Sequence, residues 1–94
     1  MITEKIKNII IETISPYKPR SIEIFGSYSR GENEKDSDLD ILVNFEKTIN
    51  LLDLIGLEQE LSEKLGIKVD LITKRSLHKE FKKYIKKDLT TIYE

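Results

Sequence analysis

The fold is decided by the stretch "GSYSRGENEKDSDLDILV", residues 26–43, which joins a glycine-rich turn to a hydrophobic segment that opens with acidic residues. Leu39 and Ile41 flank Asp40, and this alternation of apolar and polar positions is typical of a β-strand. Because side chains two residues apart point to the same face of a strand, Asp38 and Asp40 would lie about 6 to 7 Å apart. Carboxylates at that distance repel each other, so the pattern predicts either a retained proton or a bound divalent cation.

A third acid occupies a similar place in a later hydrophobic segment. Residues 67–73, "IKVDLIT", predict a strand whose apolar side chains face the core while Asp70 points to the opposite side. If the two strands are neighbours, Asp38, Asp40 and Asp70 converge on one patch. Mg²⁺ accepts a few carboxylates and completes its octahedral shell with water and phosphate oxygens. We therefore expect a magnesium site suited to phosphate chemistry.

The glycine-rich turn is suited to an anion. Gly26 ends the segment "SIEIF", residues 21–25, which predicts a short strand, and Ser27 opens a short helix. The free backbone N–H groups of a helix start and the Ser27 hydroxyl can bind a phosphate, and a side chain at Gly26 would hinder its approach. Arg30 either contacts that phosphate or pairs with a nearby acid. Tyr28 is interpreted as a packing residue, with a contact to the base or ribose as the alternative.

The remaining periodicities predict helices around these strands. Apolar residues at helical spacing indicate a first helix opened by Thr3, a second helix over residues 50–66 and a final amphipathic helix over residues 77–89. Gly56 weakens the middle of the second of these helices. The resulting order, α-β-α-β-α-β-α, predicts an α/β (or α+β) fold in which helices pack on one face of a small mixed three-stranded sheet.

The composition limits the class of protein. With 94 residues, of which 38% are hydrophobic and 35% charged, the chain is expected to form one soluble globular domain over residues 1–94. The absence of cysteine excludes disulfide bonds and thiolate metal sites. There is neither a signal-peptide pattern nor a run of 18 apolar residues, so we predict a cytoplasmic protein without membrane contact.

Charge is distributed unevenly along the chain. Residues 32–63 contain ten acids and two bases, whereas residues 74–87 contain seven bases and one acid, although the net charge is only −1. We interpret the basic segment as the solvated face of the final helix. Contact with a nucleic acid or an acidic partner remains the alternative for this segment.

The glycine turn and the paired acids resemble a known family pattern. The chain resembles the nucleotidyltransferase superfamily of DNA polymerase beta, and more closely its minimal nucleotidyltransferases, the small antitoxins paired with HEPN-domain toxins. The resemblance covers residues 20–73 by motif and the whole chain by length and order of elements. The matching positions are Gly26, Ser27, Arg30, Gly31, Ser37, Asp38 and Asp40, with Asp70 on a later strand.

This resemblance implies an enzyme, a nucleotidyltransferase that moves AMP from ATP to a protein acceptor. By the same resemblance, Asp38 and Asp40 would hold two Mg²⁺ ions, and Asp70 would complete the shell of the second ion or take the proton of the attacking hydroxyl. The implied nucleotide-binding residues are Gly26, Ser27 and Arg30.

The resemblance also implies a partner. The acceptor would be a HEPN-domain toxin, so a hetero-oligomer or homo-oligomer is expected, and we do not expect nucleic acid as the main partner. The alternative is a non-catalytic antitoxin, a binding module that neutralises its partner by direct contact. The three acids favour the enzyme, because a site without catalysis has no need for mutually repelling carboxylates.

Overall fold

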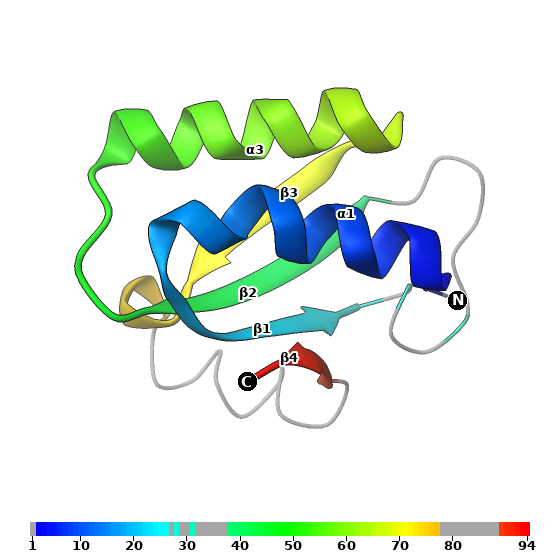
Figure 1. Ribbon diagram of the computed structural model, residues 1–94, viewed down its shortest axis with the longest axis horizontal. Helices are drawn as coiled ribbons and strands as arrows, with labels where there is room; N and C mark the ends of the chain where they lie inside the picture. Colours follow the sequence, from blue (N-terminus) through cyan, green and yellow to red (C-terminus); the bar gives the residue numbers. More distant parts are fainter. Residues whose placement is uncertain (1, 27, 29–30, 32–37, 78–88) are drawn as a thin grey trace.

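The computed structural model of the 94-residue chain describes residues 2–26, 28, 31, 38–77 and 89–94. Its helices and strands alternate along the chain, and Figure 1 shows their arrangement. In chain order they are α1 (Glu4–Ile14), a 3₁₀ turn η1 (Ser15–Tyr17), β1 (Pro19–Phe25), β2 (Leu39–Phe45), α3 (Leu51–Leu65), β3 (Val69–Thr73), a second 3₁₀ turn η2 (Lys74–Ser76) and β4 (Thr90–Tyr93).

Helix α1 begins and ends where its sequence provides the signals. The Thr3 hydroxyl accepts a hydrogen bond from the Ile6 N–H at 3.2 Å, which satisfies one of the free donors of the first turn. The helix ends at Ile14, before a 3₁₀ turn that contains Pro16. The predicted start at Thr3 is therefore confirmed.

Helix α3 is capped at both ends. Its N-cap Asn50 accepts a hydrogen bond from the Asp53 N–H at 2.8 Å and donates one to the Asp53 carboxylate at 2.9 Å. At the other end Gly66 adopts the left-handed conformation, with φ 65°, and its N–H donates to the Ser62 carbonyl. The predicted helix over residues 50–66 is confirmed in both position and length.

The sheet is mixed and contains four strands in the order β3-β2-β1-β4. β2 lies antiparallel to β1 and parallel to β3, and β4 pairs antiparallel with the free side of β1. The predicted α/β class and mixed sheet are confirmed, but the predicted count of three strands is wrong. The missed strand β4 is short and mostly exposed, with only Ile92 half-buried, so it has little of the alternation that indicates a strand.

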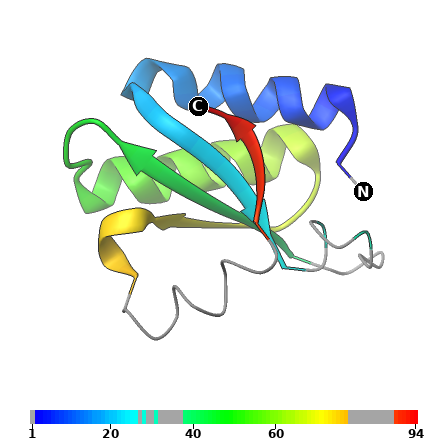
Figure 2. The ribbon, with the colours of Figure 1, turned by 90° about the horizontal axis from the view of Figure 1, so that it is seen from below.

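Both described helices cover one face of the sheet, as predicted. Figure 2, seen from below, shows the strands in front of α3. Side chains from α1, α3 and the sheet share one core, whose fully buried members include Ile10, Ile22, Ile41 and Leu61. Each such side chain contributes about 1.5 to 3 kcal/mol when it leaves water.

The opposite face of the sheet has a smaller apolar cluster. Phe25 and Leu42 are buried there, with Ile72, Leu77 and Leu89 packed against them. The predicted final helix over residues 77–89 lies outside the described residues except for these two leucines. In the part of the chain that the structure describes, no helix is both long and apolar enough to cross a membrane.

Candidate active site

The end of β1 and the start of β2 meet at a tight contact between Gly26 and Asp40. Phe25 pairs with Asp40 across the two strands, and Gly26 then turns the chain with φ 77°. A Cβ atom at Gly26 would lie 2.5 Å from the Asp40 Oδ2 atom, which is closer than real atoms approach. Glycine is therefore favoured at this position by its positive φ, and any larger residue would force the Asp40 carboxylate to move.

Asp40 and Asp70 are direct neighbours across the parallel pair of strands. In the register of β2 and β3, Asp40 lies opposite Asp70, and Leu39 lies opposite Val69. The two strands are thus neighbours, which is the condition for the three acids to lie on one patch. Leu39 and Val69 are buried towards the helices, so the alternation of the strands directs both aspartates to the other face.

The electrostatic environment of Asp40 is unfavourable to its charged form. Partial burial removes water from the carboxylate, and the negative charges of Asp70 and, to a smaller extent, Asp38 repel it. Together these effects raise the pKa of Asp40 from 3.8 to about 6. Asp70 and Asp38 therefore both repel the charge of Asp40, which is an arrangement that a cation would stabilise.

Asp38 has a partner that the sequence reasoning missed. The Lys68 Nζ atom lies 3.8 Å from the Asp38 Oδ2 atom, and both side chains are exposed to solvent. The backbone brings the two together, because the Leu39 N–H donates to the Lys68 carbonyl at 2.8 Å where β2 and β3 begin. A lysine two residues before Asp70, at the start of a parallel strand, was the signal for this contact.

The donors at this edge of the sheet fit a hard divalent cation by their chemistry. Carboxylate oxygens are the ligands that Mg²⁺ prefers, and burial together with the charges of Asp70 and Asp38 disfavours the negative charge of Asp40. Within the described residues, no three acidic or histidine side chains already form a cluster that could hold a metal. The carboxylates of Asp38, Asp40 and Asp70 are suitable ligands. To bind a metal ion together, their side chains would have to rotate, and other oxygen atoms would have to complete the coordination shell.

The structure describes only part of the predicted phosphate-binding turn. Ser27 and Arg30, together with Ser37, lie outside the described residues. Tyr28 is described, and it is buried in the main core, in agreement with its interpretation as a packing residue. The Gly31 N–H donates to the Tyr28 carbonyl at 3.3 Å and Gly31 has φ 71°, so the turn closes on this buried tyrosine.

A family model described as a nucleotidyltransferase domain matches residues 4–92, almost the whole chain. The chain belongs to the nucleotidyltransferase family. The resemblance carried by the glycine turn and the paired acids is thereby confirmed, and the match extends through α1 at one end and into β4 at the other.

Named relatives of this nucleotidyltransferase are protein adenylyltransferases. A Methanocaldococcus jannaschii protein, provisionally named a protein adenylyltransferase, is 52% identical over 92 residues, which are 97% of this chain and 91% of the relative. The Thermococcus cleftensis protein adenylyltransferase MntA is 45% identical over 73 residues, 78% of this chain and 74% of that protein.

Several solved structures with this fold are toxin-antitoxin complexes. One is a crystal structure of a toxin-antitoxin with AMP-PNP, with a TM-score of 0.85, 29% identity and coverage of 93% of this chain and 72% of the other. Another contains a tri-AMPylated Shewanella oneidensis HEPN toxin in complex with MNT antitoxin, with a TM-score of 0.81, 26% identity and coverage of 98% and 72%.

Proposed function

We propose that this nucleotidyltransferase transfers AMP from ATP to a protein acceptor, and that the acceptor is a HEPN-domain toxin for which the chain is the antitoxin. The observation that carries this proposal is the position of the Asp40 carboxylate, held against Gly26 and opposite Asp70. The similarity to protein adenylyltransferases and to an MNT antitoxin in complex with an AMPylated HEPN toxin supports the choice of nucleotide and acceptor.

The three acids would hold magnesium between them. Asp38 and Asp40 are proposed as the ligands of two Mg²⁺ ions, with Asp70 completing the site. When bound, magnesium would neutralise charge on the triphosphate and lower the pKa of the attacking hydroxyl. The ion pair with Lys68 would have to open for Asp38 to become a ligand, and because both partners are exposed this costs little.

The reaction itself is an in-line displacement at the α-phosphorus of ATP. A new bond forms between an acceptor hydroxyl oxygen and the α-phosphorus, the bond from that phosphorus to the bridging oxygen of the β-phosphate breaks, and pyrophosphate leaves. Asp70, which is exposed to solvent, is proposed to take the hydroxyl proton if it does not complete the shell of the second ion. Gly26, with Ser27 and Arg30, is proposed to bind the leaving phosphates. The chain contributes mainly position and charge.

The domain boundaries and location are part of the same proposal. We propose that residues 1–94 act as one minimal nucleotidyltransferase domain and that the acceptor hydroxyl is brought by the partner protein. A cytoplasmic site of action fits an ATP-dependent modification of such a partner.

The direct test is transfer of label from ATP labelled at the α-phosphate. The protein is incubated with Mg²⁺ and its HEPN-domain partner, and label on the partner is measured for the wild type and for Asp38→Asn and Asp40→Asn. We expect label with the wild type and a loss of at least about 100-fold with either variant. Transfer that survives in both variants would refute the assigned site.

A second candidate function is a non-catalytic antitoxin that neutralises its partner by contact. The ion pair between Lys68 and Asp38 favours it, because a lysine can compensate an acid that no metal uses. The same variants separate the two functions. If Asp38→Asn and Asp40→Asn neutralise the toxin as well as the wild type and no label is transferred, the binding module is the correct function.

A further inference from the structure

The strand that carries Asp70, β3, lies at an edge of the sheet. Its inner side pairs with β2, and in the described part of the chain no strand pairs with its outer side. Val69 and Leu71, the two neighbours of Asp70, are nevertheless buried, with only 3% and 5% of each exposed. Backbone N–H groups of buried residues need an acceptor. Those on the outer side of β3 must therefore find partners other than a strand.

Helix α3 supplies both partners from one face. The Glu58 carboxylate accepts a hydrogen bond from the Leu71 N–H at 2.8 Å, and the Ser62 hydroxyl accepts one from the Val69 N–H at 3.0 Å. Residues four apart share a face of a helix and are separated by about 6 Å along its axis. Alternate N–H groups of a strand are about 6.6 Å apart. Because the two spacings match, the helix holds the strand at two points at once.

Asp70 lies between these two points. Within the described residues its carboxylate accepts no hydrogen bond and forms no ion pair, so its position follows from the backbone of β3. Pairing with β2 places it opposite Asp40, while the bonds from α3 hold the residue before it and the residue after it. Groups that bind a ligand or metal must be held within about 0.5 Å of the productive geometry. For an exposed side chain on a short edge strand, this backbone support is the means available.

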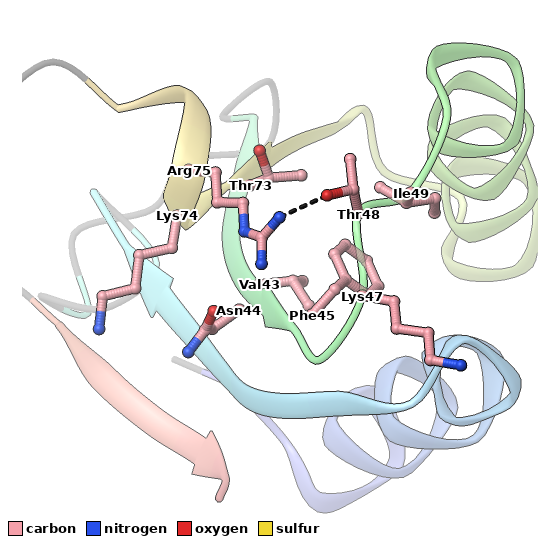
Figure 3. Close-up of a pocket in the computed structure, with 9 residues that line it drawn as sticks. All are labelled: Val43, Asn44, Phe45, Lys47, Thr48, Ile49, Thr73, Lys74 and Arg75. Atoms are coloured by element: carbon pink, nitrogen blue, oxygen red, sulfur yellow. Dashed lines mark hydrogen bonds between the residues drawn. The ribbon is translucent and has the colours of Figure 1, made fainter.

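The other end of β3 is tied to the chain before α3 by a different contact. Arg75, in the η2 turn, and Thr48 both line a cavity of about 50 Å³, and the Arg75 guanidinium donates a hydrogen bond to the Thr48 hydroxyl. Figure 3 shows this bond, with Lys47 and Lys74 extending to opposite sides of the cavity. The three cations therefore do not converge on one point. The bond supports the end of β3 that lies away from Asp70.

We propose that Glu58 and Ser62 are positioning residues of the metal site, which keep Asp70 opposite Asp40 by holding the strand on either side of it. The inference rests on the proposed function, because it takes Asp70 as part of a magnesium site. Both residues accept N–H groups at the edge beside α3, whereas Asp40 and Asp70 point to the face away from the helices. Each therefore acts on metal affinity through the backbone and not as a ligand.

Binding of Mn²⁺ to the nucleotide-free protein tests the inference without the transfer reaction. Mn²⁺ takes the same oxygen ligands as Mg²⁺, and its electron paramagnetic resonance signal measures the free ion. Ser62→Ala removes the acceptor of the Val69 N–H, and alanine favours the helix, so the variant should stay folded. It should bind Mn²⁺ about tenfold more weakly, as should Glu58→Ala, since groups that orient metal ligands have effects of this size. Glu58→Gln and Ser62→Thr keep an acceptor and should bind Mn²⁺ nearly as well as the wild type.

Thr48→Ala is the matched control. It removes the acceptor of the Arg75 guanidinium and so weakens the support of the same strand, but at the end away from Asp70. This variant should leave Mn²⁺ binding unchanged. Asp70→Asn gives the largest loss that misplacement of Asp70 can produce, and it tests the proposed metal site itself.

The outcomes separate this inference from the proposed function. If Asp70→Asn weakens Mn²⁺ binding but Ser62→Ala and Glu58→Ala do not, the positioning role is wrong and the metal site stands. The positioning role is also wrong if Thr48→Ala weakens binding as much as they do, or if Glu58→Gln loses as much as Glu58→Ala. No binding by the wild type, or equal binding by Asp70→Asn, would overturn the metal site and the inference with it.

Discussion

Replacement of Asp40 by asparagine should make the protein more stable at neutral pH. The pKa of Asp40 is raised from 3.8 to about 6 by burial, by Asp70 and by Asp38. A group with a raised pKa in the folded state binds its proton more tightly there than in the unfolded chain. The stability associated with that proton is fully present below pH 3.8 and is lost as the pH rises through about 6. Asparagine keeps nearly the same shape without a charge, so it does not lose this stability.

The size of the effect follows from the shift. A change from 3.8 to about 6 corresponds to at most about 3 kcal/mol, since one pKa unit is worth about 1.4 kcal/mol. The Asp40 side chain is only partly buried, so screening by solvent reduces this to about 1 to 2 kcal/mol. For a domain of this length, the Tm of Asp40→Asn at pH 7.5 should exceed that of the wild type by roughly 4 to 12 °C.

The assay is thermal unfolding of both proteins at several pH values without divalent cations. The difference in Tm should be near zero at pH 3.5, should grow between pH 4 and 6, and should be constant above pH 7. The control is Glu12→Gln, on the exposed face of α1. Asp53→Asn is unsuitable as a control, because the Asp53 carboxylate accepts a hydrogen bond from the N-cap residue of α3. A difference that does not change with pH, or a less stable Asp40→Asn at pH 7.5, would refute the electrostatic account.

Three further predictions concern the surroundings of this carboxylate. Gly26→Ala should destabilise the protein by about 1 to 3 kcal/mol, because alanine is strained at a φ of 77° and its Cβ atom would overlap with the Asp40 carboxylate. In a double-mutant cycle followed by unfolding, the destabilisation should be smaller when Asp40 is also replaced by alanine. Glu58→Ala should cost about 1 to 3 kcal/mol in urea unfolding, because it leaves the Leu71 N–H without its charged acceptor, and equal stability would contradict that role. Lys68→Ala should change the Tm by less than about 2 °C without Mg²⁺, because the ion pair of Lys68 with Asp38 is exposed. The variant should show a larger rise in Tm on addition of Mg²⁺ than the wild type does. A smaller rise would show that Lys68 does not compete with the cation for Asp38.

The sequence alone predicted the elements in which local signals and the pattern of burial agree. The bounds of β2 were predicted from the alternation around Asp40, and those of α3 from Asn50 and Gly66, because a strand face and a capped helix are properties of neighbouring residues. The pattern of Gly26 with the paired acids predicted the family for the same reason, since its positions lie within one short stretch of chain.

Contacts between distant segments could not be predicted in this way. The parallel register that places Asp40 opposite Asp70 depends on a crossover through α3, and the antiparallel β4 depends on the backbone of β1 having a free edge. The ion pair between Lys68 and Asp38 follows from that register as well. A pattern along the chain contains no direct information on strand order, so these features had to come from the structure.

Helix α3 connects these distant contacts to the candidate active site. The Glu58 carboxylate accepts from the N–H of Leu71, the residue directly after Asp70, and so fixes the edge strand at the point where it bears the third acid. β3 is held on one side by its pairing with β2, which places Asp70 opposite Asp40, and on the other side by this bond from α3. Because Glu58 acts through backbone position and touches neither nucleotide nor metal, Glu58→Gln should retain most of the geometry that Glu58→Ala loses. The bond to Leu71 thus gives the partly buried Glu58 a structural role on the side of α3 that faces β3.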